Sequence, residues 1–213
     1  SLEEVVAEAQ AAVLQMSAEQ EQKAARLEAL LRRQEEATRK LEQHNKKLLD
    51  LASKDPLTGL DNRRVFNRAL ETEMDRQARY DQGFSLLIVD MDYFKKVNDT
   101  FGHPIGDRIL RALSMFLKQR LRKTDHIGRY GGEEFAIIMP DTRESDARTV
   151  INDIRERFAE LTQSAGDREF HVTFSCGVAR WEGEAASSLC ERADQALYQA
   201  KTTGRNRVES TAA

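Results

Sequence analysis

Two acidic residues stand where apolar segments of the sequence end or begin, and carboxylates in that position could bind a metal ion. Asp90 ends the apolar run FSLLIVD, and Glu133 begins the outgoing arm after the two glycines of RYGGEEF, residues 129–135. If the two segments are neighbouring strands, these carboxylates meet at one edge of a sheet. Carboxylate oxygens, together with phosphate oxygens and water, are the ligands that Mg²⁺ requires. The pattern therefore predicts a magnesium site that is open to phosphate groups.

The residues beside these acids suit a substrate that carries phosphates. Gly131 and Gly132 form a tight turn, so no Cβ obstructs the approach of a substrate. The sequence MDYFKKVND after Asp90 is interpreted as a short loop whose backbone N–H groups could cradle phosphates. Each feature alone also fits a structural role, since an Asp at a strand end is commonly a cap or a solvated charge and a glycine pair is commonly only a turn.

The chain that must position these residues alternates between helix and strand patterns. Helical spacing of apolar residues predicts helices at about 63–80, 105–121, 144–161 and 187–204. Runs rich in strand formers predict strands at 84–92, at HIGRY and EEFAIIMP on either side of a two-residue hairpin turn, at 169–181 and at NRVE. The pattern indicates an α/β (α+β) domain with a mixed central sheet flanked by helices.

The composition changes abruptly at the end of residues 1–54, which contain no Gly, Pro or aromatic residue. A heptad seam that runs from Leu2 to Leu51 has apolar residues at eleven of its fifteen positions. This period predicts a left-handed coiled coil, and we expect a parallel homodimer. A single solvated helix is the alternative, but it would leave an apolar stripe in water. The expected domains are a coiled-coil helix at 1–52 and a globular domain at 53–213.

Composition argues against several classes of function. A net charge of −3 and a pI near 5.9 give no general electrostatic footprint for nucleic acid, so no nucleic-acid partner is expected. No apolar run of ~18 residues is present, which predicts no membrane contact by this fragment, and no signal-peptide pattern opens it. Cys176 and Cys190 suit a reducing compartment, so we expect a cytoplasmic location. Because the chain starts at Ser1 without a methionine, we expect a longer protein that could be tethered to a membrane upstream.

Motifs along the chain resemble those of the GGDEF family of diguanylate cyclases. They read, in order, DPLTGLDNRR, VDMDYFKKVNDTFGHPIGD, RYGGEEF and ADQALYQAKTTGRNRV, and they extend from residue 53 to about residue 209. The signature here is GGEEF, an active variant of the motif that names the family. Members join two molecules of GTP into cyclic di-GMP and release two pyrophosphates, and their fold resembles nucleotidyl cyclase and polymerase palm domains. The resemblance therefore implies a diguanylate cyclase, which is a nucleotidyltransferase.

The resemblance assigns the acidic residues to a pair of Mg²⁺ ions, two per active site, with Mn²⁺ as an alternative. Asp90 and Glu133 would be the side-chain ligands, and the Met91 carbonyl would assist them. Glu134 would help to hold the metal and to activate the attacking hydroxyl. The catalytic residues that the resemblance implies are Glu133, Glu134 and Lys95.

The resemblance also implies contacts with the substrate. For the β- and γ-phosphates they are the backbone of Tyr93, Phe94 and Lys95 and the side chains of Lys95, Lys201 and Arg205. For the guanine base they are Asn98, Asp107, Leu57 and Leu110. Asp107 can accept from the guanine N1–H and N2–H₂ edge, which adenine lacks. Without the resemblance, Lys201 and Arg205 would fit cations that satisfy carbonyls at a helix end, and Asn98 would fit an ordinary turn. Asp92 looks structural rather than metal-binding.

A further motif, RKTD at residues 122–125, precedes the signature by five residues. It resembles the family's RxxD inhibitory site, in which Arg122 and Asp125 would bind cyclic di-GMP as product and inhibitor. A helix-terminal Arg beside an Asp is the structural alternative. A second arginine is expected from elsewhere, and Arg148 and Arg155 are the candidates.

The chemistry that the resemblance implies needs two domains, because the 3′-hydroxyl of GTP on one subunit attacks the α-phosphate of GTP on the other. The coiled coil offers such a homodimer. Two other classes of function stay open. One is a non-catalytic receptor for GTP or cyclic di-GMP with the same fold, and the other is a coiled-coil scaffold whose globular part only dimerises or binds a protein. Incubation with GTP and Mg²⁺ separates all three.

Overall fold

The computed structural model describes residues 2–51, 53–80 and 83–210, so the outer limits predicted for the two domains lie outside the described residues. The chain divides into two compact units, Ser1–Ala52 and Ser53–Ala213. Among the described residues, no helix combines the length and the apolar character that a membrane crossing needs.

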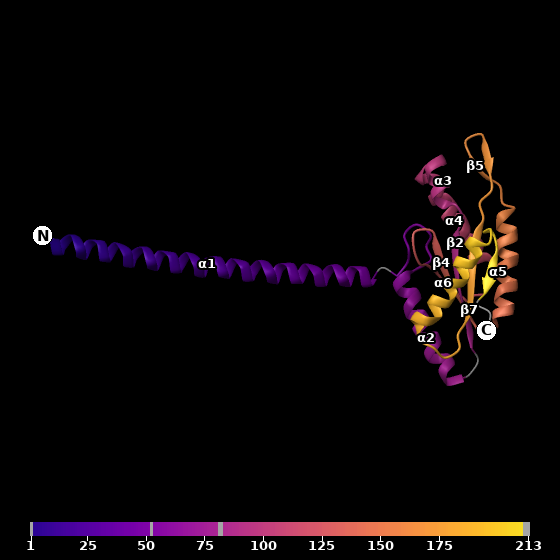
Figure 1. Ribbon diagram of the computed structural model, residues 1–213, viewed down its shortest axis with the longest axis horizontal. Helices are drawn as coiled ribbons and strands as arrows, with labels where there is room; N and C mark the ends of the chain where they lie inside the picture. Colours follow the sequence, from indigo (N-terminus) through magenta and orange to yellow (C-terminus); the bar gives the residue numbers. More distant parts are fainter. Residues whose placement is uncertain (1, 52, 81–82, 211–213) are drawn as a thin grey trace. The chain divides into compact units, whose positions relative to one another are not determined.

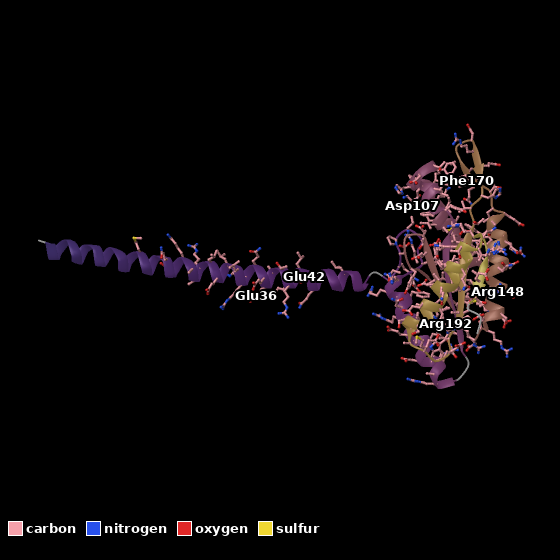
Figure 2. All side chains as sticks on the ribbon, viewed as in Figure 1. Glu36, Glu42, Asp107, Arg148, Phe170 and Arg192 are labelled. Carbon is pink, nitrogen blue, oxygen red and sulfur yellow. The ribbon has the colours of Figure 1, made fainter. Side chains whose placement is uncertain are left out.

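The first unit is a single helix, α1 (Leu2–Leu51), which Figure 1 shows without a break. Leucines of the predicted seam are exposed on it, with 55% exposure at Leu30 and 64% at Leu48. Figure 2 shows the acidic side chains of Glu36 and Glu42 extending from the same helix. The side chains of six seam residues lie outside the described ones: Leu2, Val6, Ala9, Val13, His44 and Leu51. Exposed leucines at heptad spacing are typical of a helix that packs against a partner helix.

The second unit is a mixed six-stranded sheet with helices on both faces, which confirms the predicted fold class (Figure 1). The strands in sheet order are β1 (Asp61–Asn62), β3 (His126–Arg129), β4 (Glu134–Pro140), β2 (Phe84–Met91), β7 (Phe174–Arg180) and β8 (Val208–Ser210). The helices are α2 (Arg63–Tyr80), α3 (Phe94–Phe101), α4 (His103–Arg120), α5 (Glu144–Ala159) and α6 (Ala186–Thr202). A separate hairpin consists of β5 (Gln163–Ala165) and β6 (Arg168–Phe170).

The central strand β2 is buried on both faces of the sheet. Leu87 and Val89 belong to the apolar cluster formed with α4 and α5, whereas Leu86 and Ile88 belong to the cluster formed with α2 and α6. Successive side chains of a strand point to opposite faces, so a strand covered on both sides needs apolar residues at nearly every position. This burial explains the continuous apolar run and fixes the end of β2, where Asp90 lies.

The interpretation of the residues after Asp90 as a loop was wrong, because most of them form the helix α3. Phe94 is buried, Val97 packs against the same apolar cluster, and Phe101 stacks on Phe170 with ring centroids 4.3 Å apart. These three residues have helical spacing, but the polar residues between them hid the pattern. The backbone N–H groups proposed for phosphates therefore belong to the first turn of a helix, where such groups lack intrahelical partners.

The hairpin of β3 and β4 has a wider turn than the two residues predicted. The last paired residues are Arg129 and Phe135, and the Tyr130 N–H donates to the Glu134 carbonyl at 2.8 Å. Glu133 therefore lies in the turn, and β4 begins at Glu134. Two-residue hairpin turns of types I′ and II′ require a positive φ, which neither glycine of the signature has.

Two further boundaries differ from the prediction. The segment expected as one strand at 169–181 is divided between β6 and β7, and β6 pairs with β5 in the separate hairpin instead of joining the main sheet. Gly166, with a φ of 61°, makes the turn between β5 and β6. Asp61–Asn62, which lie outside every strand predicted from the sequence, form the short strand β1, which pairs in parallel with β3. Neither difference moves the strand ends that carry the predicted metal ligands.

Candidate functional site

The acidic residues come together because β2 and β4 are antiparallel neighbours. Asp90 pairs with Glu134 in the ladder, and the Met91 N–H donates to the Glu133 carbonyl at 3.3 Å. Burial raises the pKa of Asp90, Lys201 opposes that shift, and the charge of Glu134 adds to it. Burial also raises the pKa of Glu133, and the charge of Asp90 raises it further. The carboxylates thus repel one another, and a cation beside them would relieve that repulsion.

The donor set at this strand end fits a divalent ion that also binds a substrate. In the described ranges, no three side chains of His, Cys, Asp or Glu are grouped so that they could hold a metal by themselves. Mg²⁺ is usually bound by one or two carboxylates, with waters and substrate phosphates completing the coordination. The two carboxylates predicted, Asp90 and Glu133, with the Met91 carbonyl, match that partial set.

A lysine from α6 reaches the same strand end. The Nζ atom of Lys201 lies 2.9 Å from Oδ2 of Asp90, and the aspartate side chain is 8% exposed. Helix α6 can pack this closely on β7 because Gly177 has no side chain. A Cβ at that position would lie 2.1 Å from the Ala193 carbonyl oxygen, so only glycine fits there. Lys201 therefore contacts a carboxylate of the sheet, which differs from the helix-end role considered in the sequence analysis.

Arg205, also predicted for phosphates, lies close to the start of α3. Its guanidinium carbon is 4.6 Å from the centroid of the Tyr93 ring. Tyr93 has a φ of 54°, a left-handed conformation that is strained for a residue with a Cβ. Such strain is often retained at functional sites, and here it directs the chain into the first turn of α3. Lys95 follows in that turn and is exposed.

Asp92 is structural, in agreement with its interpretation from the sequence. Its carboxylate accepts hydrogen bonds from Thr173 Oγ1 at 2.6 Å, from Ser175 Oγ at 2.7 Å and from the Asn206 N–H at 3.0 Å. These bonds attach the segment after α6 to the end of β2. The sequence gives no signal for this network, because its members come from three separate segments.

Three of the four residues predicted for a guanine base lie on α3 and α4. Asn98 is half-buried on α3, and its Oδ1 atom is buried without a hydrogen-bond partner among the described residues. A Cβ at Gly106 of α4 would lie only 2.0 Å from that oxygen, so the absence of a side chain leaves room for Asn98. A buried acceptor without a donor is costly unless a ligand supplies one.

The remaining residues predicted for the base differ in their exposure. Asp107 is half-buried on α4, where Figure 2 labels it. Leu110 is 1% exposed and belongs to the apolar core, and Leu57 packs against the same cluster from the polar segment before β1. Because Leu110 and Leu57 both contact the apolar core, the predicted base pocket would lie beside the core of the domain.

The RKTD motif borders a basic pocket of about 330 Å³. The backbone N–H of Arg122 donates to Oδ2 of Asp125 at 2.9 Å, and both residues line the pocket. Burial raises the pKa of Asp125, whereas Arg122 and the charge of His126 oppose that shift. The lining also includes three lysines that the sequence did not single out: Lys54, Lys118 and Lys123. Lys54 is distant in sequence, so no local pattern could have placed it there.

The two candidate second arginines lie elsewhere on the domain. Arg155 donates to Asn152, Asn206 and Glu156. Arg148, labelled in Figure 2, lines a different pocket with Arg207 and Glu209. Neither of these arginines is part of the lining around Arg122 and Asp125.

Arg129, two residues before the signature, has a role that no sequence pattern indicates. Arg129 donates to the Asp55 carboxylate at 3.1 Å and to the Gly132 carbonyl at 2.7 Å. Burial by itself raises the pKa of Asp55, but hydrogen bonds from Thr58 and the charge of Arg129 hold it below its ordinary value. The turn of the signature is thus connected through one side chain to the polar segment that begins the second unit.

The sequence of the chain is similar to those of known proteins. The family model described as "Diguanylate cyclase, GGDEF domain" matches residues 52–207. The chain is 39% identical over 197 residues to diguanylate cyclase DgcP of Pseudomonas aeruginosa, a match that covers 90% of the chain and 29% of the relative. It is 43% identical over 169 residues to the response regulator PleD of Caulobacter vibrioides, covering 78% of the chain and 37% of the relative. The chain thus spans less than half the length of these curated relatives.

Solved structures resemble both units of the chain. The coiled coil and GGDEF domain of DgcB from Caulobacter crescentus, in complex with c-di-GMP, has a TM-score of 0.73 and 32% identity, covering 87% of this chain and 99% of that one. Diguanylate cyclase SiaD, in complex with its activator SiaC from Pseudomonas aeruginosa, has a TM-score of 0.72 and 36% identity, covering 98% of this chain and 84% of that one.

Proposed function

Because the chain belongs to the GGDEF family of diguanylate cyclases, we propose that its globular unit condenses two molecules of GTP into cyclic di-GMP and two pyrophosphates. The observation that carries this proposal is the meeting of Asp90, Glu133 and Glu134 at one end of the β2–β4 ladder. Lys201 of α6 contacts Asp90, and Arg205 in the turn after α6 lies over the ring of Tyr93, three residues beyond Asp90, so both cationic groups proposed for phosphates lie near the end of β2.

The catalytic residues would act mainly through position and charge. When bound by Asp90, Glu133 and the Met91 carbonyl, Mg²⁺ (or Mn²⁺) supplies positive charge that lowers the pKa of the attacking hydroxyl and stabilises the leaving pyrophosphate. Glu134, paired with Asp90 in the ladder, adds negative charge at the same strand end. Lys95 would orient the phosphates from the first turn of α3.

The base would be selected by α3 and α4. Oδ1 of Asn98 is an acceptor to which no group in the described part of the chain donates, and the carboxylate of Asp107 is a second acceptor. Guanine presents N1–H and N2–H₂ donors on one edge, whereas adenine presents an N1 acceptor there. A site with two acceptors therefore favours GTP over ATP, because ATP would leave them unpaired.

The close packing of Gly106 against Asn98 leads to a test of this base site. Replacing Gly106 with Ala would place a methyl group 2.0 Å from Oδ1 and 3.0 Å from Cζ of Phe94, so Asn98 must move. We expect the KM for GTP to rise about tenfold, the ratio for one lost hydrogen bond. In an Asn98→Ala background the same substitution should add little, because its target is gone. Equal effects in both backgrounds would contradict this role of Asn98.

The basic pocket at Arg122 and Asp125 is proposed as the site at which cyclic di-GMP inhibits the enzyme. Arg122 can form bidentate hydrogen bonds with a phosphate or a guanine edge. We expect Arg122→Ala to weaken cyclic di-GMP binding about tenfold or more in calorimetry, and progress curves to stay linear to higher product concentration. Arg157→Ala on α5, which removes an exposed arginine outside this pocket, is the control. Unchanged affinity in the Arg122 variant would place the inhibitory site elsewhere.

A parallel coiled-coil homodimer of α1 is proposed to bring two globular units together. The exposed seam leucines of α1 support this proposal, since isolated helices rarely keep such residues in water. Each unit would present one GTP to the other, so activity would depend on the dimer. The direct test of the whole proposal is to incubate the purified chain with GTP and Mg²⁺ and to measure cyclic di-GMP by chromatography. Binding of cyclic di-GMP without its formation would support a receptor instead.

A further inference from the structure

Two residues with different proposed partners contact each other in this structure. Asp90 is proposed to bind a divalent ion, and Lys201 is proposed to bind the phosphates of GTP. Yet Nζ of Lys201 lies 2.9 Å from Oδ2 of Asp90, which is the distance of a charge-assisted hydrogen bond. An ammonium group at this oxygen repels any second cation that approaches it. While this contact persists, Lys201 is not free to bind phosphates, and a metal ion at Asp90 would meet the charge of the ammonium group.

The backbone holds the two groups together from both sides. Asp90 is buried at the end of the central strand, which pairs with β4 and with β7. Lys201 lies in the last turn of α6, which packs on β7 at Gly177. Beyond α6, the Asn206 N–H donates to Asp92, two residues after Asp90. The ammonium group is therefore supplied by a helix end that is attached to the same strand end as the carboxylate.

We propose that the ammonium group of Lys201 takes the place of the metal ion. It neutralises Asp90 until a nucleotide arrives with its metal. The triphosphate then gives Lys201 a new partner, and Asp90 becomes open to the ion. Metal binding and nucleotide binding are thereby coupled, and the coupling is reciprocal. The divalent ion alone binds poorly, because it must displace the ammonium group without compensation. This inference rests on the proposed cyclase function and specifies how its site is loaded.

Metal binding without nucleotide tests the proposal directly. Mn²⁺ binding to the full chain is measured by electron paramagnetic resonance in mildly alkaline buffer, for the unchanged chain and for Lys201→Met. We expect Lys201→Met to bind Mn²⁺ about tenfold more tightly, the ratio for one charge-assisted hydrogen bond that no longer competes. Lys96→Met is the matched control, since Lys96 is an exposed lysine on α3 and the loss of charge is the same. Lys201→Arg keeps a cation and should retain the weak binding.

A second arm uses a GTP analogue with a methylene group between the α- and β-phosphorus atoms, which cannot react. With Mn²⁺ present, the unchanged chain should bind the analogue, and Lys201→Met should bind it about tenfold more weakly, because the new partner of the phosphates is missing. The proposal about Lys201 would be overturned if, without nucleotide, Mn²⁺ bound equally tightly to the unchanged chain, to Lys201→Met and to Lys96→Met. If the unchanged chain fails to bind Mn²⁺ even with the analogue, the proposed cyclase function fails as well, so the two failures can be distinguished.

Discussion

Replacing Glu133 with Gln is expected to lower the formation of cyclic di-GMP by about two to three orders of magnitude. The substitution keeps the shape of the side chain but removes a negative charge that would stabilise the metal, an effect of several kcal/mol. The position of the residue should persist, because its backbone carbonyl accepts from the Met91 N–H. Product formation is measured by chromatography, with the circular dichroism spectrum as the test of folding.

The control for this prediction is Glu169→Gln, which removes the same charge from an exposed residue of β6. That variant should retain its activity. Near-normal product formation by a folded Glu133→Gln variant would show that this carboxylate does not bind the metal. The metal site would then need another ligand beside Asp90.

The second large effect concerns the seam of α1. Leu30 and Leu31 are adjacent, and their exposures in the single chain are similar, at 55% and 51%. Only Leu30 lies on the predicted heptad seam. We expect Leu30→Asp to lower the activity about a hundredfold at submicromolar protein concentration, since tethering two domains raises their effective concentration by about that factor or more. Leu31→Asp should have little effect, although it places the same residue in the same helix.

Light scattering and the dependence of activity on protein concentration check this prediction. The Leu30 variant should be monomeric at low concentration and should recover activity as its concentration rises. If Leu30→Asp and Leu31→Asp are equally active and equally dimeric, the seam is assigned incorrectly or the dimer forms through the globular unit. Either result would contradict the proposed role of α1.

The parts of the fold that could be predicted are those with strong local patterns. The apolar run at 84–92 predicted a strand, and the structure confirms it as β2, in which two clusters cover alternate residues. The turn at Gly131 and Gly132 was predicted too narrow, since the glycines suggested positive φ angles that the chain does not adopt. Helix α3 was missed because its apolar face has few residues and part of it packs on the distant Phe170.

The candidate site shows the same limit. The strand positions of Asp90 and Glu134 follow from sequence patterns, and the ladder pairs them. The contact between Lys201 and Asp90 could not be predicted, because it depends on how closely α6 packs against β7. The bond between Arg129 and Asp55 also joins distant segments. Pairings of this kind arise from tertiary packing, for which a single sequence has no periodic signal.

The two proposed metal ligands are held in place by different kinds of structure, a central strand for Asp90 and a turn for Glu133, and this difference limits how long the metal site stays formed. Asp90 belongs to a strand that has hydrogen-bonded partners on both sides, and amides in such strands exchange with solvent last. Glu133 lies in a turn, and Arg129 restrains that turn through the Gly132 carbonyl. Local opening of the turn therefore separates the two carboxylates while the sheet stays intact. The competent geometry is lost whenever the turn opens, and both the arginine contact and the hydrogen bond from the Met91 N–H to the Glu133 carbonyl oppose that opening.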